Sequence, residues 1–115
     1  MNSLDLFGKH LIEETRDRTF NTIMKMFNGS MKGVTAQKIN QLSSVFSHDQ
    51  INAINSIILI SIDYSLGNLL TMVEQNDEIV VLCDGENIKE LSDGLSGELY
   101  TEDGWIERFS QIASE

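Results

Sequence analysis

The chain has 115 residues, of which 41% are hydrophobic and 23% are charged. This length and composition predict a single globular domain over residues 1–115 and exclude a disordered acidic protein, because enough apolar side chains are present to form a core. The formal net charge of −10 disfavours direct binding to nucleic acid, whose phosphates repel carboxylates.

Cysteine content and hydropathy favour a soluble protein of the cytoplasm. The single cysteine, Cys83, lies in an apolar run and cannot form an internal disulfide. The N-terminal residues alternate between apolar and charged and do not resemble a secretory signal. The longest apolar stretch, residues 51–73, is interrupted by polar residues such as Asn55 and Asp63, so we expect it to fall short of a membrane span.

The first predicted element is a long amphipathic helix over residues 4–27. Its apolar residues recur at steps of three and four, and the chain contains no proline that would interrupt it. Ser3 is the expected N-cap, and Gly29 follows the expected C-terminus. The exposed face is expected to carry the charged residues Glu13, Glu14, Arg16, Asp17 and Arg18.

Glycines at positions 29 and 33 predict a loop, after which Thr35 is expected to cap a short helix. Ser47 followed by Gln50 forms a capping-box pattern at the start of a long apolar periodicity. We therefore predict a helix over about 48–75, with an apolar stripe wide enough to make it the central helix of the domain.

The pattern changes after residue 76. Residues 78–83, EIVVLC, predict a strand, which needs a partner: a second strand near residues 30–35, or its own copy in a dimer, unless the run is helical. Asn87 and Glu90 suggest a cap for a helix over about 87–100. A last helix after Thr101 is expected to bury Trp105. The predicted fold is mainly α, a compact bundle of four or five helices with at most a short β element near residues 78–83.

The acidic excess is confined to one part of the chain. Residues 1–73 contain six basic and six acidic side chains, whereas residues 74–115 contain twelve acidic residues and only Lys89 and Arg108. Acidic faces commonly serve solubility alone, but a concentrated negative surface also steers association with a basic partner. Trp105 is interpreted either as a core residue or as an interface anchor. The candidate partner-binding residues are Glu86, Glu90, Asp93, Glu98, Tyr100, Glu102, Asp103, Trp105 and Glu107.

Motifs for catalysis or for cofactor and metal binding are not found. His10 and His48 lack the neighbouring ligands of a zinc site, and no phosphate-binding glycine loop or calcium loop occurs. Asp63 is the one acid that could act from within a helix, if a pocket surrounds it. We expect no cofactor, no metal and no enzymatic activity.

Charge, size and missing motifs together favour a small acidic protein that neutralises a basic protein partner. A bacterial immunity protein or antitoxin inhibiting a nuclease-type toxin fits this description, because an enzyme that binds phosphate presents positive charge. The alternative is a helical homodimeric adaptor or structural module whose acidic face serves only solubility. Its support is the unpaired 78–83 run and the broad apolar surface of helix 48–75.

Overall fold

In the computed structural model, which describes residues 1–112, the chain is mainly helical, as predicted. Its elements, in chain order, are α1 (Ser3–Leu11), a π-helical segment η1 (Ile12–Asp17), α2 (Arg18–Phe27), α3 (Val34–Ser43), α4 (His48–Gln75), β1 (Leu82–Cys83), β2 (Glu86–Asn87), the 3-10 segments η2 (Ile88–Leu91) and η3 (Leu95–Leu99), and α5 (Trp105–Phe109).

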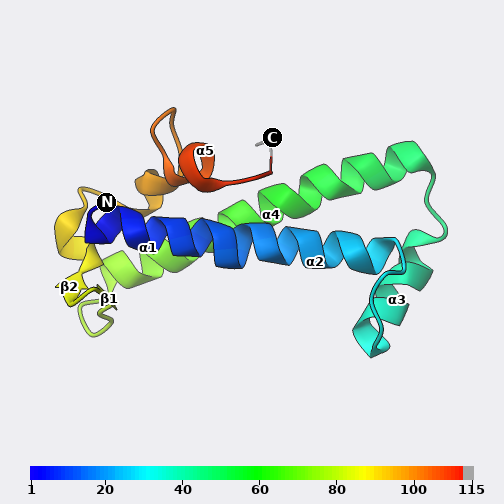
Figure 1. Cartoon of the computed structure of the whole chain (residues 1–115), viewed down its shortest axis with the longest axis horizontal. Helices are drawn as coiled ribbons and strands as arrows, with labels where there is room; N and C mark the ends of the chain where they lie inside the picture. The colour runs from blue at the N-terminus through cyan, green and yellow to red at the C-terminus, as the bar shows by residue number, and fades with distance from the viewer. Residues whose placement is uncertain (113–115) are drawn as a thin grey trace.

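Two long rods make up the frame of the molecule (Figure 1). One is the continuous helix of α1, η1 and α2, and the other is α4, which runs back beside it after α3 has reversed the chain. The two rods diverge toward α3. The hairpin of β1 and β2, the 3-10 segments and α5 all gather around α1 and the C-terminal part of α4.

The first rod begins one residue earlier than the sequence pattern suggests. Asn2, not Ser3, is the N-cap, and its side-chain oxygen accepts a hydrogen bond of 2.8 Å from the Asp5 amide. Ser3 is instead buried and donates its hydroxyl to Glu86 over 3.0 Å. Asn and Ser are comparable N-caps in isolation, so the tertiary contact of Ser3 decides between them.

α4 has the predicted bounds and the predicted capping box, in which Ser47 and Gln50 exchange side-chain and backbone hydrogen bonds. Its other end is capped by Lys89, whose Nζ donates to the carbonyls of Val73, Asn76 and Ile79. By length and mean hydropathy alone α4 is long and apolar enough to cross a membrane, despite its polar residues, although core helices of soluble proteins meet the same criteria.

The β element is smaller than the apolar run from which it was predicted. Only Leu82 and Cys83 are in a strand, and they pair with Asn87 and Glu86 of the same chain across a two-residue turn. Asp84 and Gly85 both have positive φ, as in the type I′ turns that suit tight hairpins. The proposed partners at residues 30–35 and in a second copy are therefore not those seen, because the partner strand immediately follows the turn.

The predicted helix over 87–100 is replaced by η2 and η3. Gly94 is extended, with φ of 175°, and separates the two segments. Ile88, Leu95 and Leu99 are nevertheless fully buried, so the apolar spacing predicted the inward residues but not the helix type.

The closed core lies at one end of the molecule. It joins residues of α1, η1, the C-terminal half of α4, the 3-10 segments and α5, namely Leu4, Leu11, Ile12, Leu66, Leu70, Val73, Ile88, Leu95, Leu99, Trp105 and Ile106. By contrast, α2 contains no buried residue. We call the end with this core the closed half, and the end formed by α2, α3 and the N-terminal half of α4 the open half.

Candidate functional site

Trp105, the candidate interface anchor, is a core residue. Its side chain has no exposed surface and meets the ring of Phe7 edge-on, with 6.0 Å between ring centroids. The indole nitrogen donates to Asp5 over 3.2 Å, which satisfies the one polar atom of the ring. The anchor interpretation is therefore wrong, because α5 packs its tryptophan against α1.

Asp5 also holds Arg108 in a two-pronged ion pair, with distances of 3.1 and 3.2 Å. The hydrogen bonds from Arg108 and Trp105, with the positive charge of Arg108, lower the pKa of the Asp5 carboxyl, while partial burial opposes them. Asp5 in turn raises the pKa of Arg108. This contact fastens α5 to α1, near the two ends of the described chain.

A second buried network is centred on Arg16, which the sequence pattern placed on the exposed face. Arg16 is fully buried and donates to both oxygens of Asp63 on α4, over 2.5 and 3.1 Å, and to the Ser110 hydroxyl over 2.9 Å. Asp17 is also buried and accepts hydrogen bonds from Ser110 and from the Gln111 amide. The prediction for Arg16 and Asp17 is wrong because η1 turns two consecutive side chains inward.

This network assigns Asp63 a structural contact. Both of its oxygens accept hydrogen bonds from Arg16, and its backbone carbonyl lies 3.4 Å from the Tyr100 hydroxyl. Burial, followed by the negative charge of Asp63, raises the pKa of the Tyr100 phenol. A carboxylate engaged by a buried guanidinium is poorly placed to accept a proton from a substrate.

The other candidate partner-binding residues separate into two groups according to their exposure and ion pairing. Glu98 is half-buried and accepts a hydrogen bond of 3.3 Å from Ser92. Tyr100 is partly exposed beside α4. The remaining candidates are exposed and, within residues 1–112, form no ion pair; we call them the acidic cap: Glu86, Glu90, Asp93, Glu102, Asp103 and Glu107.

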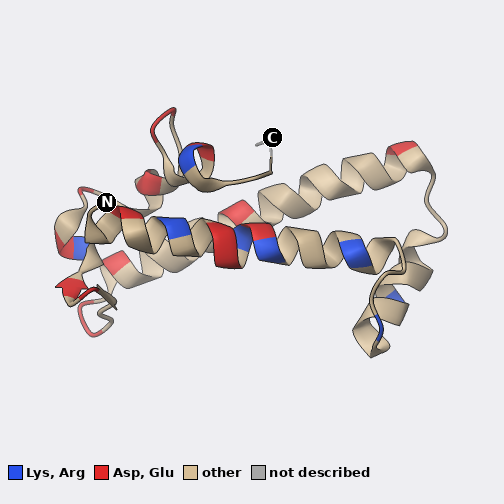
Figure 2. Cartoon of the chain, in the orientation of Figure 1, with Lys and Arg blue, Asp and Glu red and all other residues tan. Residues whose placement is uncertain are grey.

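The acidic cap surrounds the closed half and does not follow one helix. Glu86 lies on β2 and Glu90 on η2, whereas Glu102 and Asp103 precede α5 and Glu107 lies on it. In the view of Figure 1 the hairpin and α5 lie on opposite sides of α1, so the acidic cap is divided into two groups. Figure 2 shows that acidic ribbon segments nonetheless concentrate at this end.

The basic residues of the same sequence region are both engaged internally. Lys89 caps the carbonyls at the end of α4, and Arg108 is paired with Asp5 and stacks on the Phe109 ring at 4.7 Å. At the other end of the molecule, residues 19–60 contain three lysines and a single aspartate, Asp49. The molecule is therefore electrically polarised along its length (Figure 2).

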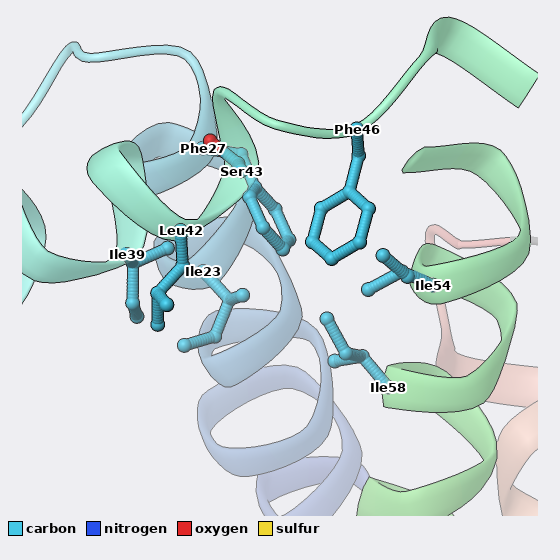
Figure 3. Close-up of a pocket in the computed structure, with 8 residues that line it drawn as sticks. All are labelled: Ile23, Phe27, Ile39, Leu42, Ser43, Phe46, Ile54 and Ile58. Atoms are coloured by element: carbon cyan, nitrogen blue, oxygen red, sulfur yellow. The ribbon is translucent and has the colours of Figure 1, made fainter. Parts of the chain in front are cut away.

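One prominent surface feature was not predicted from the sequence. The open half contains an apolar groove between α2, α3 and α4, with a volume of about 450 Å³ (Figure 3). The periodicity of helices 4–27 and 48–75 marked the apolar faces that line it, but periodicity does not say whether such faces meet. No group of three His, Cys, Asp or Glu side chains suited to a metal occurs in the described part of the chain.

Comparison with protein-family models, with curated proteins and with solved structures gives no match to this chain.

Proposed function

We propose that the chain is a non-enzymatic binding protein that uses its acidic cap to occupy a basic surface of another protein. The observation that supports this proposal is the contrast between two sets of carboxylates. Asp5, Asp17, Asp63 and Glu74 accept hydrogen bonds that hold the fold together. The cap carboxylates form no ion pair within residues 1–112, and Glu86 alone among them accepts a side-chain hydrogen bond there, from Ser3, although their mutual repulsion is unfavourable for folding.

The kind of partner follows from the charge. A dense group of exposed carboxylates accelerates encounter with a cationic surface and repels nucleic acid and other acidic proteins. Nucleases present such a surface, because they must bind phosphates. The specific version of the proposal is an immunity protein or antitoxin that acts in the cytoplasm and covers the phosphate-binding surface of a nuclease toxin.

A pair of matched variants tests this function. Glu102→Lys with Asp103→Lys reverses two cap charges in an exposed turn, and Glu13→Lys with Asp49→Lys makes the same change in net charge outside the cap. Each variant is mixed with the protein encoded by the adjacent reading frame of the source genome, and binding is followed by calorimetry at about 0.05 and 0.5 M salt.

We expect the wild type and the Glu13/Asp49 variant to bind more tightly at low salt, and the Glu102/Asp103 variant to lose at least about 10-fold in affinity. Equal loss in both variants would indicate an effect of net charge alone. Unchanged binding in the cap variant, with weak dependence on salt, would favour the alternative in which the acidic residues serve only solubility.

A further inference from the structure

The apolar groove has walls of three separate elements. Ile23 and Phe27 come from α2, Ile39 and Leu42 from α3, and Ile54 and Ile58 from α4; Phe46 and Ser43 complete it. In Figure 3 the side chains of Ile54 and Ile58 point toward Phe46 and across to the opposite wall. Leu42 and Phe46 remain exposed by 58% and 41%. The groove is thus an unfilled continuation of the core between the diverging rods.

An exposed apolar ridge runs along the middle of α4, from its N-terminal half to the first turn of its C-terminal half. Its members are Ile57, Ile60 and Tyr64, which are exposed by 62%, 45% and 69%. Spacings of three and four residues place them on one face of the helix, next to the face that carries Ile54 and Ile58. We call these three residues the α4 ridge. The open half therefore presents a protrusion and a depression side by side, both apolar.

The chain as a whole exposes more surface than a compact monomer, and the exposed large apolar side chains Leu42, Phe46, Ile57 and Ile60 lie on its open half. The chain exposes 7348 Å², whereas a compact monomer of 12.9 kDa exposes about 6,300 Å². Its radius of gyration of 16.3 Å likewise exceeds the value of about 13 Å for a compact chain of this length. The excess of about 1,000 Å² is close to the roughly 800 Å² that each partner buries in a standard interface.

We propose that the open half is the interface of a homodimer, in which the α4 ridge of each copy enters the apolar groove of the other. A two-fold symmetric interface requires a surface that is complementary to itself, and a ridge beside a groove satisfies this requirement. The proposal does not depend on the partner of the acidic cap, which lies on the other half of the molecule.

The distribution of charge favours this relative orientation of the two copies. Two molecules of net charge −10 repel each other least when their acidic caps are far apart. Pairing through the open halves places the caps at the two outer ends of the dimer. The open half carries few charges, namely Arg18, Lys25, Lys32 and Lys38 against Asp49, and none of these residues lines the groove, so that desolvation of its apolar centre meets little opposition.

Ile57→Asp tests the interface, with Leu82→Asp as a matched control. Both side chains are exposed by 62%, so neither change disturbs a closed core, but Leu82 lies on the hairpin at the other end. Light scattering coupled to size exclusion, together with sedimentation equilibrium, measures mass over a range of concentrations. Circular dichroism verifies that each variant is folded.

We expect twice the chain mass for the wild type and for Leu82→Asp. Ile57→Asp enters a symmetric interface twice and is expected to weaken the dimer at least about 100-fold. A monomeric wild type up to millimolar concentration would overturn the proposal, as would a dimer indifferent to Ile57→Asp. A mass that grows without limit would indicate head-to-tail contact of cap and lysines instead.

Two further measurements separate a second copy from other occupants. In a Cys83→Ser background, Ile57→Cys on the ridge combined with Leu42→Cys in the groove is expected to give a disulfide-linked dimer under mild oxidation, whereas Leu82→Cys combined with Leu42→Cys is not. Flotation with neutral phosphatidylcholine vesicles measures any affinity for lipid. Vesicle binding by a monomeric protein, abolished by Ile57→Asp, would assign the open half to a membrane surface and contradict the dimer.

Discussion

The burial of the Arg16 guanidinium is a feature of a single residue that the sequence pattern did not predict. Charged residues between two apolar groups of an amphipathic helix are normally solvated, and this rule predicted an exposed Arg16. The one available signal was the gap in the apolar pattern between Ile12 and Phe20, where inward positions still had to be occupied. Its carboxylate partner, Asp63, is 47 residues away, so no local pattern could identify the pair.

Gly8 packs directly against the indole of Trp105. A Cβ at Gly8 would overlap the ring, which has no free surface on any side. Gly8→Ala is therefore expected to lower the free energy of unfolding by about 2–3 kcal/mol or more. Urea denaturation followed by the emission of the single tryptophan gives both the loss of stability and any displacement of the ring.

Gly97→Ala is the control for this substitution, since nothing lies within 4 Å of the position that its Cβ would take. We expect a change of less than about 0.5 kcal/mol. Similar losses for the two variants would show that backbone freedom, and not the contact with Trp105, decides the cost.

At the scale of elements, both ends of α4 were predictable from sequence, whereas its two halves differ in burial. The capping box and the apolar period fixed both of its ends from local sequence. The prediction of one helix over 87–100 failed because the chain is extended at Ser92 and Gly94, between the two 3-10 segments that carry Ile88, Leu95 and Leu99 into the core. Local patterns thus identified the buried residues better than the hydrogen bonding between them.

The two halves of α4 should differ in local stability. Leu66, Leu70 and Val73 anchor its C-terminal half, whereas Leu59 is the buried residue of its N-terminal half and Ile54 and Ile58 line the groove. Ser47→Ala removes the cap and is expected to cost about 1 kcal/mol. Hydrogen exchange should show this loss in residues 48–58, with the C-terminal half still protected. Equal loss of protection along the whole helix would show that α4 unfolds only as a unit.

At the scale of the whole molecule, one acidic residue links the first helix of the described chain to the last. Asp5 joins α1 to Trp105 and Arg108, contacts that span about a hundred positions in sequence. Neither the pairing nor the division of the acidic cap between two sides of α1 could be predicted, because both depend on how distant elements pack. The uneven charge of the chain, in contrast, was evident from sequence and persists as polarity of the structure.

The stabilisation that the Asp5 contacts provide should depend on pH. Folding lowers the pKa of Asp5, so its stabilisation is complete above the ordinary Asp pKa of about 4 and disappears as pH falls through the lower pKa of the folded state. We expect Asp5→Asn to cost about 1 kcal/mol at pH 7 and progressively less below about pH 4. The difference in stability between wild type and variant is measured from their midpoints of urea denaturation at a series of pH values from 7 to below about 4. A difference that stays constant with pH would contradict this role, and Asp93→Asn in the exposed cap serves as the control.

Because the core unites Leu4 of α1 with Trp105 of α5, a ribosome cannot deliver a complete core until it has translated the last of these elements. At roughly 5–20 residues per second, some 2–6 s separate the synthesis of Gln75, at the end of α4, from that of Trp105. Throughout that interval the nascent polypeptide displays the inward faces of both rods. Closure of the core therefore waits for the synthesis of α5, whatever the stability of the two rods.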